Sequence, residues 1–346
     1  MSEDRTSYTE WLERCERLVA SRFLPDAAVR LAVRVALRRR LRWLERERLA
    51  TCDQLPTVGP IAVETETANR QHYELPTEFF RVVLGPRLKY SSALWSAEVK
   101  TLSEAEDAML ELTAARAALA DGQRILDLGC GWGAFSLWAA KRYPTAKITA
   151  LTNSRTQEVY VRDRAGTHGL SNLDVRRGNA ASLKLDGRFD RIVSIEMLEH
   201  VRNVRPLLNQ LAAVLERDGQ MFVHVFSHRR YAYTFEPQDG WMARWFFSGG
   251  VMPDLDHFSR NTQAFRTTER WILNGEHYAR TLQAWLRNLD ANRNLALCAL
   301  REFYGAANAE LWLARWRLFF IACAELFAFR RGDEWVVAHH VLVPAE

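Results

Sequence analysis

The chain has 346 residues, of which 48% are hydrophobic and 26% are charged, a balance typical of a globular protein with a large core. This composition excludes a disordered or fibrous chain. The formal net charge is +5, and 42 of the 47 basic residues are arginines. We attribute this skew to genome base composition and expect no nucleic-acid partner.

The five cysteines form no CxxC pair, so the sequence predicts neither a zinc ribbon nor a disulfide framework. The N-terminus has no apolar signal core, and no run of 18 apolar residues occurs in the chain. We therefore expect a cytoplasmic protein that does not span a membrane.

The first 120 residues predict helices. Apolar residues recur at helical spacing from residue 8 to about residue 50, which indicates two or three amphipathic helices separated by Pro25. The helix expected over 27–49 is rich in arginine, and two interpretations of its basic face stay open. We favour a solvated face over one that lies on an anionic membrane. A loop at 56–60 leads to a second helical region that extends to residue 120.

From residue 124 onward, strands and helices alternate. The predicted strands are 124–129, 147–152, 173–178, 189–196 and 219–226, and the predicted helices are 134–143, 156–167 and 204–216. This alternation indicates an α/β fold with a parallel sheet covered on both faces. After Phe226 the alternation stops: residues 228–265 are irregular and aromatic, 276–330 are helical, and 334–343 close the chain as a strand.

The turn after the first strand, DLGCGWG over 127–133, is the candidate cofactor site. In an open parallel sheet the ligand binds beyond the carboxyl ends of the strands. Glycines such as Gly129 and Gly131 let the backbone approach a ligand closely. The GxGxG spacing differs from the dinucleotide pattern GxGxxG, and Asp127 precedes it at the strand end. These features favour a nucleoside with a charged amino-acid tail over a pyrophosphate.

This turn resembles that of the S-adenosylmethionine-dependent methyltransferases. The segments LDLGCGWG, ALTNSRTQ and RIVSIEMLEH are similar to motifs of two related families, the cyclopropane-fatty-acid synthases and the coclaurine N-methyltransferase-like enzymes. The second resemblance is closer and covers nearly the whole chain, including IAVETETANRQHYELPTEFF, RTLQAWLRNLDAN and LARWRLFFIACAELFAF. It implies a Rossmann-like methyltransferase domain over 121–346, with a helical and aromatic substrate-binding insertion at about 227–330. Residues 1–120 would form a helical region that includes a cofactor lid.

The resemblance also implies a set of residues for S-adenosyl-L-methionine. In both families a tyrosine–serine pair closes over the cofactor, and later positions meet its ribose and adenine. The corresponding residues of this chain are Tyr90, Ser91, Asp127, Gly129, Gly131, Thr152, Asn153, Gln157, Asn179, Ala180 and Ile195. Asn179 stands where an aspartate is usual, and its amide oxygen retains the ability to accept a hydrogen bond.

The candidate catalytic residues Glu196, Glu199 and His200 follow the fourth predicted strand. We expect a turn of helix here, in which spacings of three and four residues place the three side chains on one face at the mouth of the cofactor site. Attack on a sulfonium requires a free lone pair, so a protonated amine must first lose its proton to a base. The resemblance implies that the three residues surround the substrate nitrogen and that Glu199 and His200 accept the proton. An alternative is that these two residues only cap the helix and loop.

Aromatic residues are abundant outside the predicted sheet, and ring faces stabilise cations and flat substrates. We predict Trp241 and Trp335 to line the substrate pocket. His339 and His340 are adjacent on a strand and face opposite sides, so they cannot chelate one metal, and we expect both to be structural. No group of residues has metal-ligand spacing.

A cyclopropane synthase, which uses bound bicarbonate as a base, is the main alternative to an N-methyltransferase. Positions associated with that anion are retained at Glu199, His224 and Tyr278, whereas Ser92 replaces the usual cysteine. We assign His224 and Tyr278 to the substrate site in either case. A non-enzymatic cofactor-binding regulator would be expected to lose the base. The expected partner is a small-molecule amine; membrane contact belongs only to the synthase alternative, and a homodimer stays open.

Overall fold

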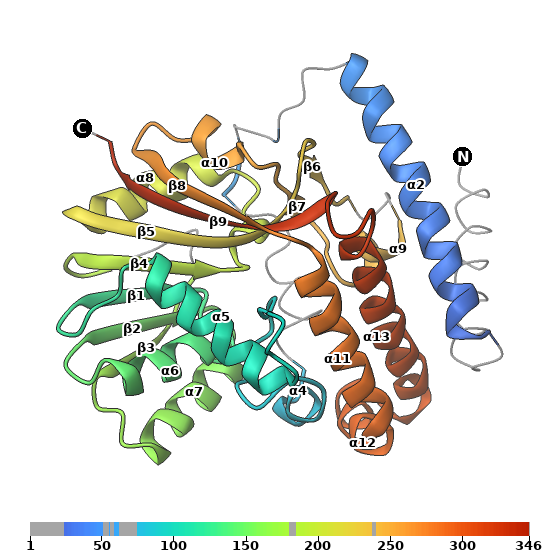
Figure 1. The fold of residues 1–346 in the computed structure, drawn as a ribbon. Helices are drawn as coiled ribbons and strands as arrows, with labels where there is room; N and C mark the ends of the chain where they lie inside the picture. Colours follow the sequence, from blue (N-terminus) through green and yellow to red (C-terminus); the bar gives the residue numbers. More distant parts are fainter. Residues whose placement is uncertain are drawn as a thin grey trace.

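A computed structural model describes residues 24–50, 55, 59–61, 75–179, 185–236 and 240–345. Its centre is a seven-stranded sheet in the order β3-β2-β1-β4-β5-β9-β8 (Figure 1). The strands are β1 (Arg124–Leu128), β2 (Lys147–Thr152), β3 (Leu173–Arg177), β4 (Phe189–Ile195), β5 (Leu215–His228), β8 (Phe265–Leu273) and β9 (Trp335–Pro344). The first five run parallel, and β9 lies antiparallel between β5 and β8.

Helices cover both faces of this sheet, as the alternating sequence pattern predicts. Three of them, α5 (Leu102–Arg116), α6 (Ala134–Arg142) and α7 (Arg155–Thr167), pack on one face, where Ile125 and Ile148 are buried. On the other face, α8 (Val204–Val214) shares a hydrophobic cluster with Leu126 and Leu128. Alternate residues of β1 therefore contribute to the hydrophobic layers on the two faces of the sheet, which explains why Ile125, Leu126 and Leu128 are all apolar.

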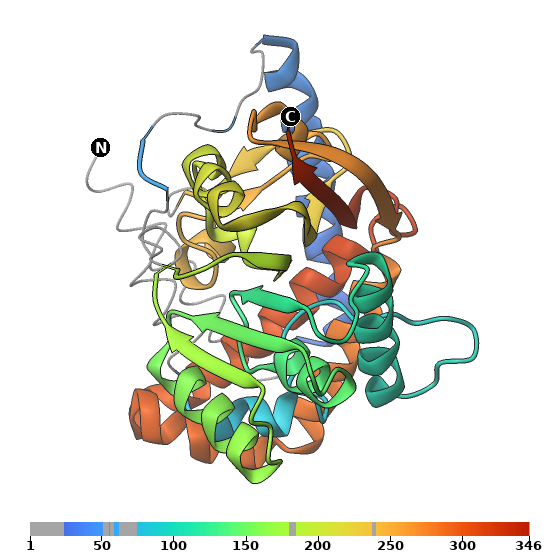
Figure 2. The same ribbon diagram turned by 90° about the vertical axis from the view of Figure 1, so that its left-hand side faces the viewer.

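A second group of helices lies beside the sheet. It comprises α4 (Thr77–Val83), α11 (Glu276–Ala291), α12 (Arg293–Tyr304), α13 (Ala306–Phe327) and the long α2 (Asp26–Ala50). Figures 1 and 2 show α2 along the outer side of α13, opposite the sheet. Side chains of α2, of residues 75–88 and of α11–α13 share one hydrophobic core. Residues from the two ends of the sequence thus form a single helical unit.

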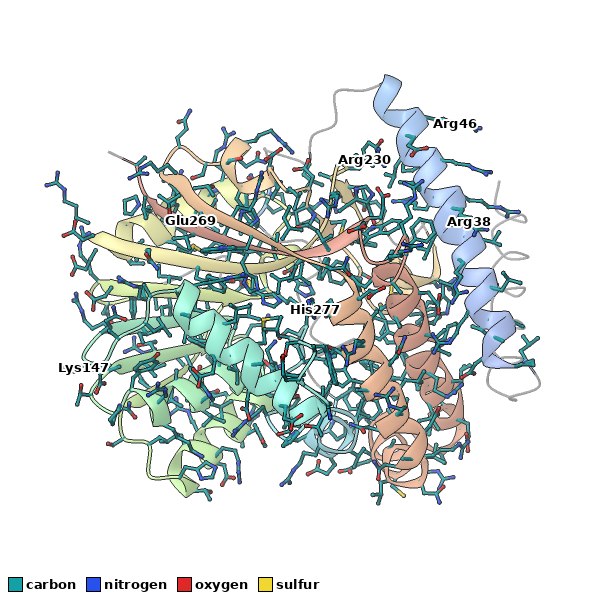
Figure 3. All side chains as sticks on the ribbon, viewed as in Figure 1. Arg38, Arg46, Lys147, Arg230, Glu269 and His277 are labelled. Carbon is teal, nitrogen blue, oxygen red and sulfur yellow. The ribbon has the colours of Figure 1, made fainter. Side chains whose placement is uncertain are left out.

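Salt bridges reinforce the contact between α2 and α13. Glu325 is 5% exposed and accepts hydrogen bonds from Arg30 at 2.7 Å and Arg34 at 2.5 Å. Arg317 pairs with Asp26 and with Asp290 of α11. Two arginines of α2 and one of α13 therefore hold the helical unit together. Arg38 and Arg46 are exposed (Figure 3), and Arg38 lines a groove between α2 and the C-terminal end of α13.

The structure differs from the sequence prediction mainly after residue 214. Strand β5 begins at Leu215, four residues earlier than predicted, and β8 was not predicted at all. Much of β8 is exposed, and its charged residues include Arg266, Glu269 and Arg270, which suits the edge position it occupies. In the described part of the aromatic region the elements are short: β6 (Tyr233–Thr234), α9 (Trp241–Trp245), β7 (Val251–Met252) and α10 (His257–Arg260).

The predicted helix before Pro25 lies outside the described residues. Within the part of the chain that the structure describes, no helix combines the length and the apolar character needed to cross a bilayer.

Candidate functional site

A cavity opens at the carboxyl ends of β1, β2 and β4, where a parallel sheet usually binds its ligand. The empty space within it, including open solvent at its mouth, is about 1280 Å³. The predicted cofactor residues that line it are Tyr90, Ser91, Asp127, Gly129, Gly131, Thr152, Asn153, Gln157, Asn179 and Ile195. The structure thus brings together residues from five separate segments. Ala180 lies outside the described residues.

The glycine turn brings the backbone to the cavity wall. Gly129 has φ +84°, and a Cβ atom built on it would lie 2.4 Å from Cγ of Met197. Gly131 has φ +54°, and a Cβ atom there would meet nothing within 4 Å. Both positions adopt the left-handed conformation that favours glycine. Because Gly131 lines the cavity, a larger side chain at this position would enter the ligand space.

Two buried polar groups behind the turn complete this part of the site. Asp127 accepts a hydrogen bond from the Ser136 hydroxyl, which joins the end of β1 to α6; burial raises the pKa of Asp127 to about 7. Thr152 donates to Oε1 of Gln157 at 2.6 Å. The Gln157 amide nitrogen is buried and has no hydrogen-bond partner among the described residues. A buried donor without a partner is costly, so this group fits a polar ligand at the cavity wall.

Glu196 is the centre of the polar cluster beyond β4. Its Oε1 accepts hydrogen bonds from the Ser92 backbone N–H at 2.8 Å and from His224 Nε2 at 3.1 Å. Its Oε2 accepts from the Tyr278 hydroxyl at 2.5 Å. Glu196 has φ +46°, an unfavourable value for a residue with a side chain, and such strain is typical of functional sites. The conformation turns its carboxylate into the cavity wall.

Lys89 is a buried cation of this site that sequence reasoning missed. It lines the cavity, is 2% exposed, and donates to Ser91 Oγ at 2.5 Å and to the Ser92 carbonyl at 2.6 Å. Burial lowers the pKa of Lys89 to about 8, against the opposing effect of the Glu196 charge. Burial raises the pKa of Glu196 to about 7, and Lys89 counteracts that rise. The two groups are therefore each other's counter-ions in a water-poor pocket.

The sequence predicts that the side chains of Glu196, Glu199 and His200 lie on one face of a helical turn, and this geometry is wrong. The segment is a single 3-10 turn, Leu198–His200, preceded by the left-handed Glu196. Glu196 and His200 line the cavity, and the His200 ring lies 4.9 Å from that of Phe247. Glu199 is fully buried behind the wall. The three residues share one end of the sheet but not one face.

The carboxyl group of Glu199 is only half satisfied. Its Oε1 accepts from the Phe226 backbone N–H at 2.9 Å, and its Oε2 has no hydrogen-bond partner within the described part of the chain. Burial, together with the negative charge of Glu196, raises the pKa of Glu199 well above its usual range. Burial and the charge of Glu196 therefore favour the protonated form of Glu199, and a cation close to it would favour the charged form.

The two predicted pocket tryptophans lie away from this cavity. Trp335 is completely buried and donates its indole N–H to the Tyr233 hydroxyl at 3.0 Å. Trp241 packs against Phe246 in the aromatic core. Neither contributes to the cavity lining described above, so their contact with substrate stays a prediction.

Contacts between the 88–95 segment and α11 join the cavity wall to the helix that carries Tyr278, which does not itself line the cavity. The backbone N–H of Trp95 donates to His277 Nδ1 at 3.1 Å, and its indole N–H donates to Thr281 at 3.0 Å. His277 lies at the start of α11, near the centre of the view in Figure 3. The segment that carries Tyr90 and Ser91 is thus fastened to the helix that carries Tyr278. Among the described residues, no group of three His, Cys, Asp or Glu side chains forms a metal site.

Comparison with known proteins identifies relatives of this chain. The sequence model of the mycolic acid cyclopropane synthetase family matches residues 62–337. A (S)-coclaurine N-methyltransferase of Thalictrum flavum subsp. glaucum is 33% identical over 91% of both chains. The cyclopropane-fatty-acyl-phospholipid synthase of Escherichia coli (strain K12) is 28% identical over 78% of this chain and 66% of its own length.

A solved structure extends this similarity to the fold. The crystal structure of coclaurine N-methyltransferase bound to N-methylheliamine and S-adenosylhomocysteine aligns with a TM-score of 0.90 and 31% identity, covering 95% of this chain and 99% of the other. The agreement includes both the sheet and the helical unit, because almost all of each chain is aligned.

Proposed function

Because the chain belongs to the mycolic acid cyclopropane synthetase family and is an S-adenosylmethionine-dependent methyltransferase, we propose that it methylates the nitrogen of a small cyclic amine of the isoquinoline type. The relatives that align over nine-tenths of the chain support this acceptor. One of them is a (S)-coclaurine N-methyltransferase, and a solved structure of coclaurine N-methyltransferase holds N-methylheliamine. When bound, S-adenosylmethionine supplies an electrophilic methyl group. The residues of this chain supply the cavity, the charges and the proton acceptors.

The observation that carries the proposal is the position of the Glu196 carboxylate. In the synthase alternative, His224 and Tyr278 belong to the bicarbonate site, and Ser92 stands in place of its cysteine. All three positions already donate to Glu196, through the Ser92 N–H, the His224 ring and the Tyr278 hydroxyl. A side-chain carboxylate thus occupies the donors that a bound bicarbonate would need. This favours a reaction that uses the protein's own carboxylates.

The raised pKa values of the two glutamates suit a cationic acceptor. An ammonium ion in the cavity beside Glu196 stabilises the charged form of Glu196 directly and that of Glu199 across the cavity wall, so binding of the amine lowers both pKa values. The amine proton can then pass to Glu199 or His200, which leaves the nitrogen lone pair free for an in-line displacement. Tyr90 and Ser91 close the cofactor side of the cavity in this proposal. The finer assignments, including a cytoplasmic location, a homodimer and pocket roles for Trp241 and Trp335, stay predictions.

One assay with labelled S-adenosylmethionine separates the two functions. We expect label in a tetrahydroisoquinoline such as heliamine, at the same rate in ordinary and carbonate-free buffer. Vesicles of unsaturated phospholipid should receive none. Bicarbonate-dependent label in fatty acyl chains would overturn the proposal in favour of the synthase.

A further inference from the structure

A continuous row of hydrogen bonds connects the active-site carboxylate to the end of α5. His224 Nε2 lies 3.1 Å from Glu196 Oε1, and His224 Nδ1 lies 3.0 Å from His339 Nε2. His339 Nδ1 in turn lies 2.7 Å from Nη1 of Arg116, the last residue of α5. Both histidines are buried, on the neighbouring strands β5 and β9, and their positions face each other across the sheet register.

The direction of every bond in this row follows from its outer end. A guanidinium group has donors only, so Arg116 must donate to His339 Nδ1. His339 then carries its proton on Nε2 and donates to His224 Nδ1. For the same reason His224 carries its proton on Nε2 and donates to Glu196. One arginine thus determines the tautomers of two histidines and points both N–H groups toward the carboxylate.

We propose that Arg116 is a positioning residue for methyl transfer, acting through His339 and His224 to hold Glu196 as an oriented carboxylate. This role deepens the proposed function and rests on it for its kinetic test. The row cannot carry a proton out to solvent, because an arginine side chain does not accept one. Aligned donors strengthen one another in a medium of low dielectric, so the row stabilises negative charge at its inner end.

The surroundings keep this row in place. The guanidinium of Arg116 lies over the Trp271 ring of β8, 4.5 Å from its centroid, which holds the group against the sheet edge. Burial lowers the pKa of both histidines well below the usual range, and the charge of Arg116 acts in the same direction. They therefore remain neutral, as the tautomer argument requires. The other titratable groups that act on Glu196 or on the two histidines are Lys89, Glu199, Tyr278, His340 and Cys323.

The kinetic test compares Arg116→Met with wild type over pH 6 to 9, using heliamine as acceptor. Loss of the outer donor should lower kcat/KM roughly tenfold near pH 6.5, in the range seen when a supporting partner of an active-site ligand is removed. The acid limb of the profile should move to higher pH, and activity should recover in part at pH 9. Arg116→Lys retains a charged donor and should restore most of the activity.

Two further variants distinguish a positioning role of Arg116 from a general loss of structure near the end of α5. Arg191→Met removes a half-buried arginine that donates to the carbonyls of Ala117 and Ala118, just after α5, and it should leave the pH profile unchanged. His339→Phe should reproduce the Arg116→Met profile, and the double variant should be no worse than either single one. An unchanged acid limb in a folded Arg116→Met protein would overturn the proposal.

A spectroscopic test does not depend on the methyl acceptor. In the substrate-free protein with ¹⁵N-labelled histidine, His224 and His339 should both be neutral and carry the proton on Nε2. The Nδ1 resonance of His339 should change in Arg116→Met but not in Arg191→Met. A protonated Nδ1 on either histidine in the wild type would contradict the hydrogen-bond directions assigned to the row. Failure to methylate any amine, with these resonances as expected, contradicts only the proposed function.

Discussion

The substitution Glu196→Gln tests the centre of the site with little change of shape. A glutamine oxygen can still accept from the Ser92 N–H and from His224, and its amide group can donate to the Tyr278 oxygen once that hydroxyl rotates. The fold should therefore persist. What disappears is the negative charge beside Lys89 and beside the incoming ammonium group. Loss of a positioned proton-accepting or charge-stabilising group typically costs 10²–10⁴ in rate, which corresponds to about 3–5 kcal/mol of transition-state stabilisation.

The assay for Glu196→Gln combines steady-state kinetics on heliamine with calorimetry of S-adenosylmethionine binding. We expect the loss in kcat/KM and a cofactor affinity within a few-fold of wild type. Glu334→Gln is a matched control, since the side chains of Glu196 and Glu334 are each 6% exposed but Glu334 pairs with Arg230 and Arg330. Equal activity of the two variants, both near wild type, would refute the role assigned to Glu196.

Three other substitutions test separate parts of the structure. Gly131→Val should abolish cofactor binding because its side chain enters the open cavity at φ +54°, and calorimetry on the folded variant checks this; unchanged affinity would contradict the assigned cofactor turn. His200→Ala should lower kcat by about 10²–10⁴, with partial recovery at high pH where more amine is already neutral, and wild-type kcat at pH 7 would leave His200 only structural. Glu106 is fully buried and burial raises its pKa to about 7, so its carboxyl group should destabilise the fold by up to about 3 kcal/mol as the pH rises from about 4.5 to 7. Urea unfolding of Glu106→Gln should have a smaller pH dependence over this window, and an identical slope would refute the burial argument.

Most of the predicted cofactor residues that line the cavity could be found from the sequence because they follow the ends of strands. The carboxyl ends of parallel strands meet at one edge, so local motifs such as Asp127-Leu-Gly and Thr152-Asn153 gather there whatever the details of packing. The strand and helix pattern over 124–214 is equally local, and the structure confirms it.

The polar cluster around Glu196 was less predictable. It depends on the φ angle of Glu196 and on hydrogen-bond partners that are distant in the sequence. The position of Glu199 behind the wall follows from the left-handed conformation of Glu196, which no spacing rule reveals. Lys89 did carry a signal: it is one of five lysines in a chain that otherwise uses arginine, and it directly precedes the Tyr90–Ser91 pair. Lysine tolerates burial by shifting its pKa, whereas arginine does not. The role of His339 emerges only when β9 pairs with β5.

The core shared by α2 and α13 has a consequence for synthesis of the chain. Arg30 and Glu325 are 295 positions apart, so the first described helix cannot reach its partner until the chain through Glu325 has left the ribosome. Until then, the apolar side of α2 around Leu41 and Leu44 has nothing to cover it. The sheet can form earlier from its consecutive parallel strands. A nascent chain would therefore pass through a stage in which the cofactor edge of the sheet has formed while the apolar side of α2 is still exposed, and docking of α13 would end that stage.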